Sequence, residues 1–345
     1  MCDMVKIKQE TGNRKQETGN RKQETGNRKQ EIDIARGIAI ILVVLGHAIA
    51  KTSELDGMLL PKALKSTFDI IYGFHMPLMF FISGIFINNS IKGGFQSFVR
   101  KKINRLVIPY FIWVFITVFI KILTSRYQYH QRTWVDFFLS PFIPFEQYYF
   151  IYVAFFLSLF YFFLGQKDFL FFACVSYFSI KIIPDVWVTR LLVSFALYFA
   201  LGSVFNQFTE KYGNCFYKKS YAIFTYVIFM LHSFMLSSMV AFIGILFTLQ
   251  FSHLIFTKKI FSVCTILDWC GRKSMQIYCM HPIFMGIIRI ISHKIIGIDY
   301  PYLMTITQLI FALVLCWLVL KVCATYDVLN NIQSIIWGDK NLVKG

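Results

Sequence analysis

Charged residues are scarce in this chain, at 15% of 345 residues, against roughly 25% in soluble globular domains. Hydrophobic residues instead make up 57% and aromatic residues 18%, and the mean hydropathy is +0.57. Apolar runs long enough to cross a bilayer recur from Ile38 to Cys323. The composition excludes an ordinary soluble domain and predicts an all-α, polytopic helical membrane protein.

Several sequence motifs of common enzyme classes are also missing. The chain has no GxSxG, no P-loop and no paired carboxylates within its apolar runs, which disfavours a serine hydrolase, an ATPase and a proton-coupled transporter. Its eight cysteines show no CxxC or Cys/His ligand spacing, so neither a metal site nor a disulfide framework is expected. Much of the net charge of +17 falls on alternate loops, which indicates contact with membrane lipids rather than nucleic acid.

The N-terminal residues 8–31 contain three copies of Lys-Gln-Glu-Thr-Gly-Asn-Arg followed by Lys-Gln-Glu. The repeat has no apolar a and d positions, so it excludes a coiled coil and predicts a disordered cytoplasmic tail over residues 1–31. The same seven residues can be encoded by three copies of the heptanucleotide AAACAGG. We therefore expect about ten tandem copies of this unit in the gene. Loss or gain of one copy would shift the reading frame and produce phase variation; an in-frame duplication is the alternative.

The apolar runs predict about ten transmembrane helices in a membrane domain over residues 32–325, followed by a cytoplasmic C-terminal tail over residues 326–345. An even number of spans places both termini on one side, and the most basic loops share that side. The prediction is therefore a multi-pass protein of the bacterial inner membrane with cytoplasmic termini and no secretory signal peptide. The segments are about 34–52, 68–88, 106–123, 148–164, 168–183, 187–206, two short spans within 220–256 that turn near His232, 274–296 and 302–323.

The first predicted span carries Arg36 at one end and His47 inside it. In a helix, His47 lies roughly 16 Å from Arg36, near the middle of a bilayer. An ionisable side chain at that depth indicates a functional site, although a packing hydrogen bond to a neighbouring helix is the alternative. For Arg36 the alternative is a topology anchor. His75 lies in the outer half of the antiparallel second span, where it can approach His47.

Two further stretches carry candidate residues. A basic loop that precedes the third span contains Arg100, Lys102 and Arg105, which suit the phosphates of a cytoplasmic anionic ligand. Positive-inside bias and lipid contact are the alternative for these cations. The ninth span begins with Ser274 and places His281 about 10 Å into the membrane, where a hydrogen bond to a neighbour is the alternative to a functional role.

Four motifs follow one another along the chain. They are Asp33-Ile-Ala-Arg36 with ten residues before His47, Phe74-His-Met-Pro…Ser-Gly84, Arg105-Leu-Val-Ile-Pro109, and Gly271-x-x-Ser274…Tyr278-x-x-His281-Pro282. In this order they resemble the acyltransferase 3 family of integral membrane acyltransferases, and more narrowly its fucose 4-O-acetylase-like branch. The resemblance covers about residues 31 to 325. Two positions depart from it: Lys102-Ile-Asn-Arg105 where relatives often have Arg-x-x-Arg, and Gln147-Tyr-Tyr-Phe150 in place of His-Leu-Trp-Phe.

The resemblance implies an O-acetyltransferase that moves an acetyl group from cytoplasmic acetyl-CoA to a hydroxyl of a cell-surface polysaccharide, such as capsule or lipopolysaccharide, or of a lipid-linked glycan, without a metal. His47 would act as general base or transient acyl carrier together with Arg36, and His75 would orient His47 or the acceptor. The donor phosphates would contact Arg36, Arg100, Lys102 and Arg105, with support from Ser274, Tyr278 and His281.

Two other classes of function remain open at this stage. One is a transporter or flippase for glycan precursors, and the other is a scaffold among polysaccharide-synthesis proteins. Transport is disfavoured because the chain has a single midplane histidine pair and no evident two-fold internal repeat.

Overall fold

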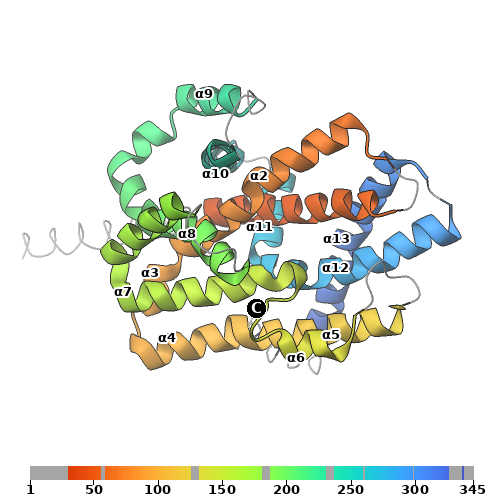
Figure 1. Ribbon diagram of the computed structural model, residues 1–345. Coiled ribbons are helices and arrows are strands. Elements are labelled where there is room, and N and C mark those ends of the chain that lie inside the picture. The colour runs from red at the N-terminus through yellow and green to blue at the C-terminus, as the bar shows by residue number, and fades with distance from the viewer. Residues whose placement is uncertain are drawn as a thin grey trace, which may run out of the picture.

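The computed structural model describes residues 30–55, 59–125, 132–180, 187–230, 237–258, 261–297, 299–325 and 336–337. The regular elements within these ranges are helices, without a strand, which confirms the all-α prediction (Figure 1). An N-terminal helix (Gln30–Ser53) is followed by α2 (Lys62–Ile85), α3 (Ile87–Ile91), α4 (Gly94–Lys102), a π-helix (Ile103–Val107), α5 (Ile108–Leu123), α6 (Trp134–Leu139), a 3-10 helix (Glu146–Tyr148), α7 (Tyr149–Ser179), α8 (Trp187–Phe216), α9 (Lys219–Met230), α10 (Ser237–Thr257), α11 (Phe261–Arg272), α12 (Ser274–Ile290), a second π-helix (Ile291–Ile295) and α13 (Pro301–Thr325).

Eight of the described helices are long and apolar enough to cross a membrane, so the chain is a multi-pass membrane protein. The predicted number of ten spans is not confirmed. The fourth and fifth predicted spans fall together within α7. The first half of the predicted pair within 220–256 is α9, whose 12 residues extend about 18 Å, well short of the ~30 Å hydrocarbon core.

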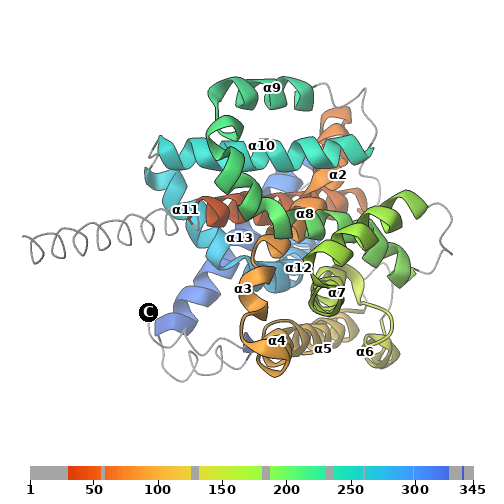
Figure 2. The same ribbon diagram turned by 90° about the vertical axis from the view of Figure 1, so that its left-hand side faces the viewer.

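The helix α7 is broken at Gly165, where the sequence analysis ends the fourth span. Gly165 has φ 76° and ψ 173°, a backbone conformation that residues with a Cβ rarely adopt. The two halves of α7 run in different directions (Figure 2). The glycine therefore produces a sharp bend inside one element.

The predicted basic loop before the third span is wrong, because α4, the π-helix and α5 form one helical run from Gly94 to Leu123. Lysine and arginine are good helix formers, so Arg100, Lys101 and Lys102 are compatible with a continuous helix. The stretch that leads from Lys258 to Lys273 is likewise not a loop, since α11 occupies most of it.

Some predictions fall outside the described residues. These are the repeat tail up to residue 29, the connection between the predicted spans 168–183 and 187–206, the turn near His232, and the C-terminal tail other than Ile336 and Trp337.

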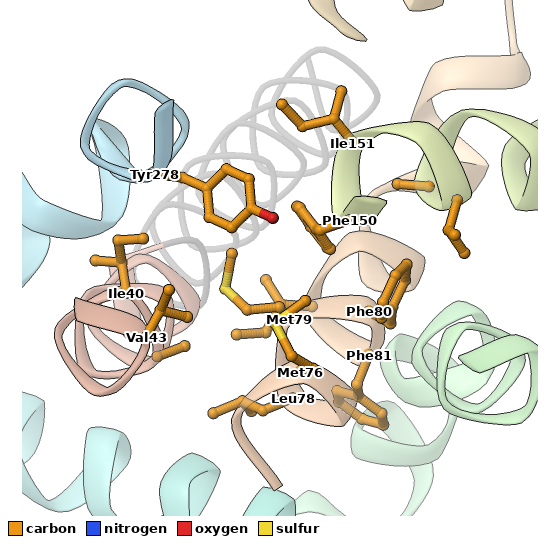
Figure 3. Packing of buried hydrophobic residues seen from close by; sticks show 14 of the residues in the cluster. Ile40, Val43, Met76, Leu78, Met79, Phe80, Phe81, Phe150, Ile151 and Tyr278 are labelled. Atoms are coloured by element: carbon orange, nitrogen blue, oxygen red, sulfur yellow. The ribbon is translucent and has the colours of Figure 1, made fainter. Parts of the chain in front are cut away.

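The N-terminal helix lies in the centre of the bundle in both views, with α9 and α10 along one edge and α4, α5 and α6 along the opposite edge (Figures 1 and 2). Its apolar residues pack against α2, α7 and α12, as Figure 3 shows for Ile40, Val43, Met79, Phe150 and Tyr278. The central position explains why polar groups on this helix, Arg36 and His47 among them, meet other helices rather than lipid.

The crossing of α2 and α8 depends on two glycines. A Cβ added to Gly84 would lie 2.0 Å from the carbonyl oxygen of Phe199, and one added to Gly202 would lie 1.9 Å from that of Phe81. Such distances are below any allowed contact, so the two backbones approach closely because side chains are absent. Small residues thus allow these two membrane helices to pack closely.

Replacement of Gly84 by alanine is expected to destabilise the fold by about 1–3 kcal/mol, because the helices must separate to admit the methyl group. Gly286→Ala is the matched control, since no atom lies within 4 Å of its added Cβ. Thermal unfolding of both purified variants in detergent should show a lowered midpoint for Gly84→Ala alone. Equal midpoints would contradict the tight crossing.

Candidate functional site

Two histidines from distant parts of the sequence meet inside the bundle. The Nδ1 atom of His47, on the N-terminal helix, lies 3.2 Å from Nε2 of His281 on α12, and the ring centroids are 5.1 Å apart. His281 is fully buried, whereas His47 is partly exposed. The pair therefore combines an enclosed imidazole with one that remains accessible.

Tyrosines surround the His281 segment of α12. Tyr148 donates a hydrogen bond to the carbonyl of Cys279 at 2.9 Å, and the Tyr278 hydroxyl donates to the carbonyl of Gln147. The stretch from Gln147 to Phe150, which departs from the family pattern, therefore packs directly on α12. This packing fixes α12 next to the start of α7.

His75 lies on α2 near His47, as predicted, but its own hydrogen bond is to the backbone of α2. Its Nδ1 atom donates to the carbonyl of Ile71 at 2.6 Å, and the side chain is only 2% exposed. Its ring lies 4.9 Å from that of Tyr72, which in turn lies 6.5 Å from the ring of His47. The structure thus brings His75 near His47 through Tyr72 and gives His47 a hydrogen bond to His281 instead.

A cavity of about 480 Å³ opens at the end of the bundle that contains Arg36, called here the Arg36 end. This volume is within the range of ligand-binding pockets. Five cationic side chains and one carboxylate line it, which leaves an excess of four positive charges. The lining cations are Arg36, Lys101, Lys102, Arg105 and Arg272, and the carboxylate is Asp33.

Arg36 is held in this cavity by contacts on two sides. Its guanidinium Nη1 donates to the Asp33 carboxylate at 3.0 Å, and its Cζ lies 4.7 Å from the ring centroid of Phe86. The carboxylate and the aromatic ring together limit the orientation of the guanidinium. Arginine so placed presents its remaining N–H groups in a fixed fork, a geometry that matches phosphate oxygens.

Gln276 supplies an unpaired polar atom in the same cavity. The residue is only 8% exposed, and its Oε1 atom has no hydrogen-bond partner among the described residues. A buried acceptor without a donor is costly, so its presence in a cavity wall indicates a ligand that supplies an N–H or O–H group.

The predicted donor-binding residues divide between the cavity and the surface. Lys102, Arg105, Ser274 and Tyr278 line the cavity with Arg36, whereas Arg100 is exposed outside it. Lys101 lines the cavity, where Arg100 was predicted.

The candidates predicted from the sequence lack several cavity residues, Gln276, Arg272 and Trp337 among them. Trp337 belongs to the predicted C-terminal tail, yet it is 6% exposed and its ring lies 5.4 Å from that of Trp113. The available signal was an apolar Ile-Ile-Trp run that ends at Trp337 in the tail. Arg272 is the last residue of α11 and Gln276 lies in the first turn of α12, so their closeness in sequence to Ser274 was the signal for them.

Tyr278 connects the cavity with the histidine pair. It lines the cavity, and its ring centroid lies 6.1 Å from that of His281. A ligand in the cavity that extends past Tyr278 would therefore reach the two imidazoles.

The opposite end of the N-terminal helix, called here the Glu54 end, carries two groups of ion pairs. Glu54 accepts hydrogen bonds from Lys51 at 2.8 Å and from Arg289 at 3.2 Å. Glu146 accepts from Lys121 and lies 3.0 Å from Arg132. The Glu54 end thus carries paired charges, of which the Lys51 and Glu54 side chains are exposed.

In the part of the chain that the structure describes, no three His, Cys, Asp or Glu side chains gather as metal ligands. The arrangement as a whole can hold a polyanion at the Arg36 end and perform proton transfer or nucleophilic attack at a buried imidazole.

The fold and site define a multi-pass membrane protein with a hydrogen-bonded histidine pair inside the bundle, near a cationic cavity. The family model described as an acyltransferase domain, that of the acyltransferase 3 family, matches residues 29–324, and the chain belongs to this family. It is accordingly a membrane acyltransferase. No curated protein and no solved structure matches the chain.

Proposed function

We propose that the protein is an O-acetyltransferase that moves an acetyl group from acetyl-CoA to a hydroxyl of a cell-surface polysaccharide or lipid-linked glycan. The observation that carries the proposal is the continuity between the cationic cavity, Tyr278 and the His281–His47 pair. The Arg36 end faces the cytoplasm, where acetyl-CoA is made, and the glycan approaches from the Glu54 end. The basic residues gathered at the Arg36 end support this orientation and a location in the inner membrane, with both termini cytoplasmic.

The cavity suits the chemistry of coenzyme A. Its excess positive charge complements the phosphates, which contact Arg36, Lys102 and Arg105. The unpaired Oε1 atom of Gln276 accepts a hydrogen bond from an amide N–H of the pantetheine arm. The thioester then lies beyond Tyr278, beside His47.

His47 acts on the acceptor by one of two routes. As general base, it takes the proton of the sugar hydroxyl while the oxygen attacks the thioester carbonyl, the C–S bond breaks and the thiol leaves with a proton. This contribution is worth roughly 10²–10⁴ in rate. As nucleophile, it first forms an acyl-imidazole that the hydroxyl then cleaves. Both routes yield the acetyl ester and free coenzyme A.

Purified protein in proteoliposomes tests the proposal. It should consume acetyl-CoA only when a glycan acceptor is present, and mass spectrometry should find the acetyl increment on that acceptor. Movement of lipid-linked sugar without acetyl-CoA consumption would support a flippase instead. Neither activity, together with loss of glycan synthesis when the gene is deleted, would support a scaffold for polysaccharide-synthesis proteins.

Gln276→Leu is expected to raise the KM for acetyl-CoA about 3–10-fold with little change in kcat, because one neutral hydrogen bond to the donor is lost. Gln308→Leu is the matched control. Gln308 is also fully buried with an unpaired Oε1 atom, but it bonds Thr52 and does not line the cavity. Initial rates at varied acetyl-CoA concentration measure both; an equal rise in KM would contradict the role of Gln276.

The heptapeptide repeats support expression that switches on and off by slippage of the seven-base unit, as suits an enzyme that alters a surface glycan. Sequencing of the gene from single colonies should show copy numbers that differ by single units. Synonymous differences between the repeats would rule out slippage and favour an in-frame duplication.

A further inference from the structure

The hydrogen bonds of His281 determine where its own proton lies. Its Nδ1 atom is 2.9 Å from the carbonyl oxygen of Ile277. A carbonyl only accepts hydrogen bonds, so Nδ1 carries the proton. No carboxylate is among the partners that the described residues supply to His281, and a charged imidazole buried there without a counterion would be costly. His281 is therefore neutral, and its Nε2 atom has a free lone pair.

The backbone of α12 fixes the orientation of the His281 ring. Pro282 lies inside α12 and has no backbone N–H, so the carbonyl of Tyr278, four residues earlier, receives no helical hydrogen bond from it. The Nδ1 atom of His281 bonds the adjacent carbonyl, that of Ile277, in the same turn. The ring is therefore held by its own helix.

The orientation of His281 in turn determines the tautomer of His47. The Nε2 lone pair of His281 lies 3.2 Å from Nδ1 of His47, so Nδ1 must carry a proton and donate it. The other nitrogen of His47, Nε2, is then unprotonated, and His47 is the partly exposed member of the pair. A neutral imidazole with a free Nε2 is the form that can accept a proton or attack a thioester.

We propose that His281 is the positioning residue of this acyltransferase: it holds His47 in the Nδ1-protonated tautomer and so makes Nε2 the reacting atom. The proposal rests on the proposed function. Enzymes that use a histidine base often hold its imidazole in the reactive tautomer with a second side chain. Here that side chain is a neutral histidine whose own ring is held by the helix backbone. His75 does not fill this role, because the hydrogen bond of His47 is made with His281, whereas His75 is related to His47 through Tyr72, whose ring lies beside both.

Two substitutions of similar shape separate positioning from packing. In His281→Gln the amide oxygen can still accept a hydrogen bond from Nδ1 of His47, whereas the sulfur of His281→Met fills the same space but accepts only weakly. The kcat of His281→Met should fall about 10²–10³-fold. His281→Gln should retain activity within about tenfold of wild type, and the KM for acetyl-CoA should change less than about twofold in both variants.

The measurement is acetyl-CoA consumption by the full-length chain in proteoliposomes, with thermal unfolding of each variant as the check on folding. Equal kcat values for the two variants would overturn the positioning role, whether both are active or both inactive. If neither variant folds, histidine-selective 15N labelling of the wild-type protein decides, with His47→Ala to assign the signal. A protonated Nδ1 on His47 supports the proposal and a protonated Nε2 overturns it.

The proposed function and the positioning role of His281 are contradicted by different results. A wild-type protein that never consumes acetyl-CoA overturns the proposed function and the positioning role with it. An active wild-type protein whose His281→Met variant is equally active overturns the positioning role alone.

Discussion

Replacement of His47 by alanine is expected to abolish acyl transfer, with a loss of at least about 10²–10⁴-fold in kcat, while the protein stays folded. The side chain is partly exposed, and its main polar contact is the hydrogen bond to His281, so its removal opens little of the core. The expected loss follows because no other described imidazole is positioned to replace it: His281 is enclosed, and His75 bonds its own helix.

Acetylation of the surface glycan, measured by mass spectrometry in cells that carry each variant, gives the result. His293→Ala is the matched control, because His293 lies outside the site and contacts Asp299 at 3.5 Å. Loss of transfer in both variants would indicate a general effect of histidine removal on the fold. Normal acetylation by His47→Ala would end the catalytic assignment.

Features within a single helix were predictable from the sequence. Arg36 and His47 lie on one apolar run, and the helical rise alone fixes their separation and places them at different depths. That another helix can approach Gly84 closely was also predictable, because the sequence itself shows that glycine has no side chain. These predictions needed no knowledge of which helices are neighbours.

The partner of His47 could not be predicted in the same way. The antiparallel arrangement of consecutive spans favours His75, yet 234 residues separate His47 from His281, its hydrogen-bond partner in the structure. Consecutive membrane helices are adjacent often but not always, and the sequence carries no signal for which distant helix packs against the first. The tertiary arrangement decides this contact.

The basic stretch around Lys102 illustrates a second limit. Charge and positive-inside bias indicated its side of the membrane but not its conformation, and a helix with a π-turn replaces the expected loop. That helix brings Lys101, Lys102 and Arg105 to the cavity and leaves Arg100 exposed. The assignment of individual cations depends on helical register, which the composition of a basic stretch does not reveal.

Substitution of Arg36 by glutamine is expected to raise the KM for acetyl-CoA about 10–100-fold, because a charge-assisted contact to phosphate is lost. The effect is specific to an arginine whose orientation is set by Asp33 and Phe86. Arg36→Lys keeps the charge but not the planar fork, so its KM should lie between those of wild type and Arg36→Gln. Initial rates at varied acetyl-CoA concentration measure the three values.

Arg100→Gln provides the matched control, since Arg100 belongs to the same basic stretch as the cavity residues but is exposed outside the cavity. Its KM for acetyl-CoA should stay within about twofold of wild type, because salt screens the interaction of an exposed charge with a ligand that it does not contact. A high ionic strength should raise the wild-type KM more than that of Arg36→Gln, which has one phosphate contact fewer. Equal KM increases for Arg36→Gln and Arg100→Gln would instead indicate that donor binding responds to the overall charge of this end of the bundle, and the cavity would then not be the donor site.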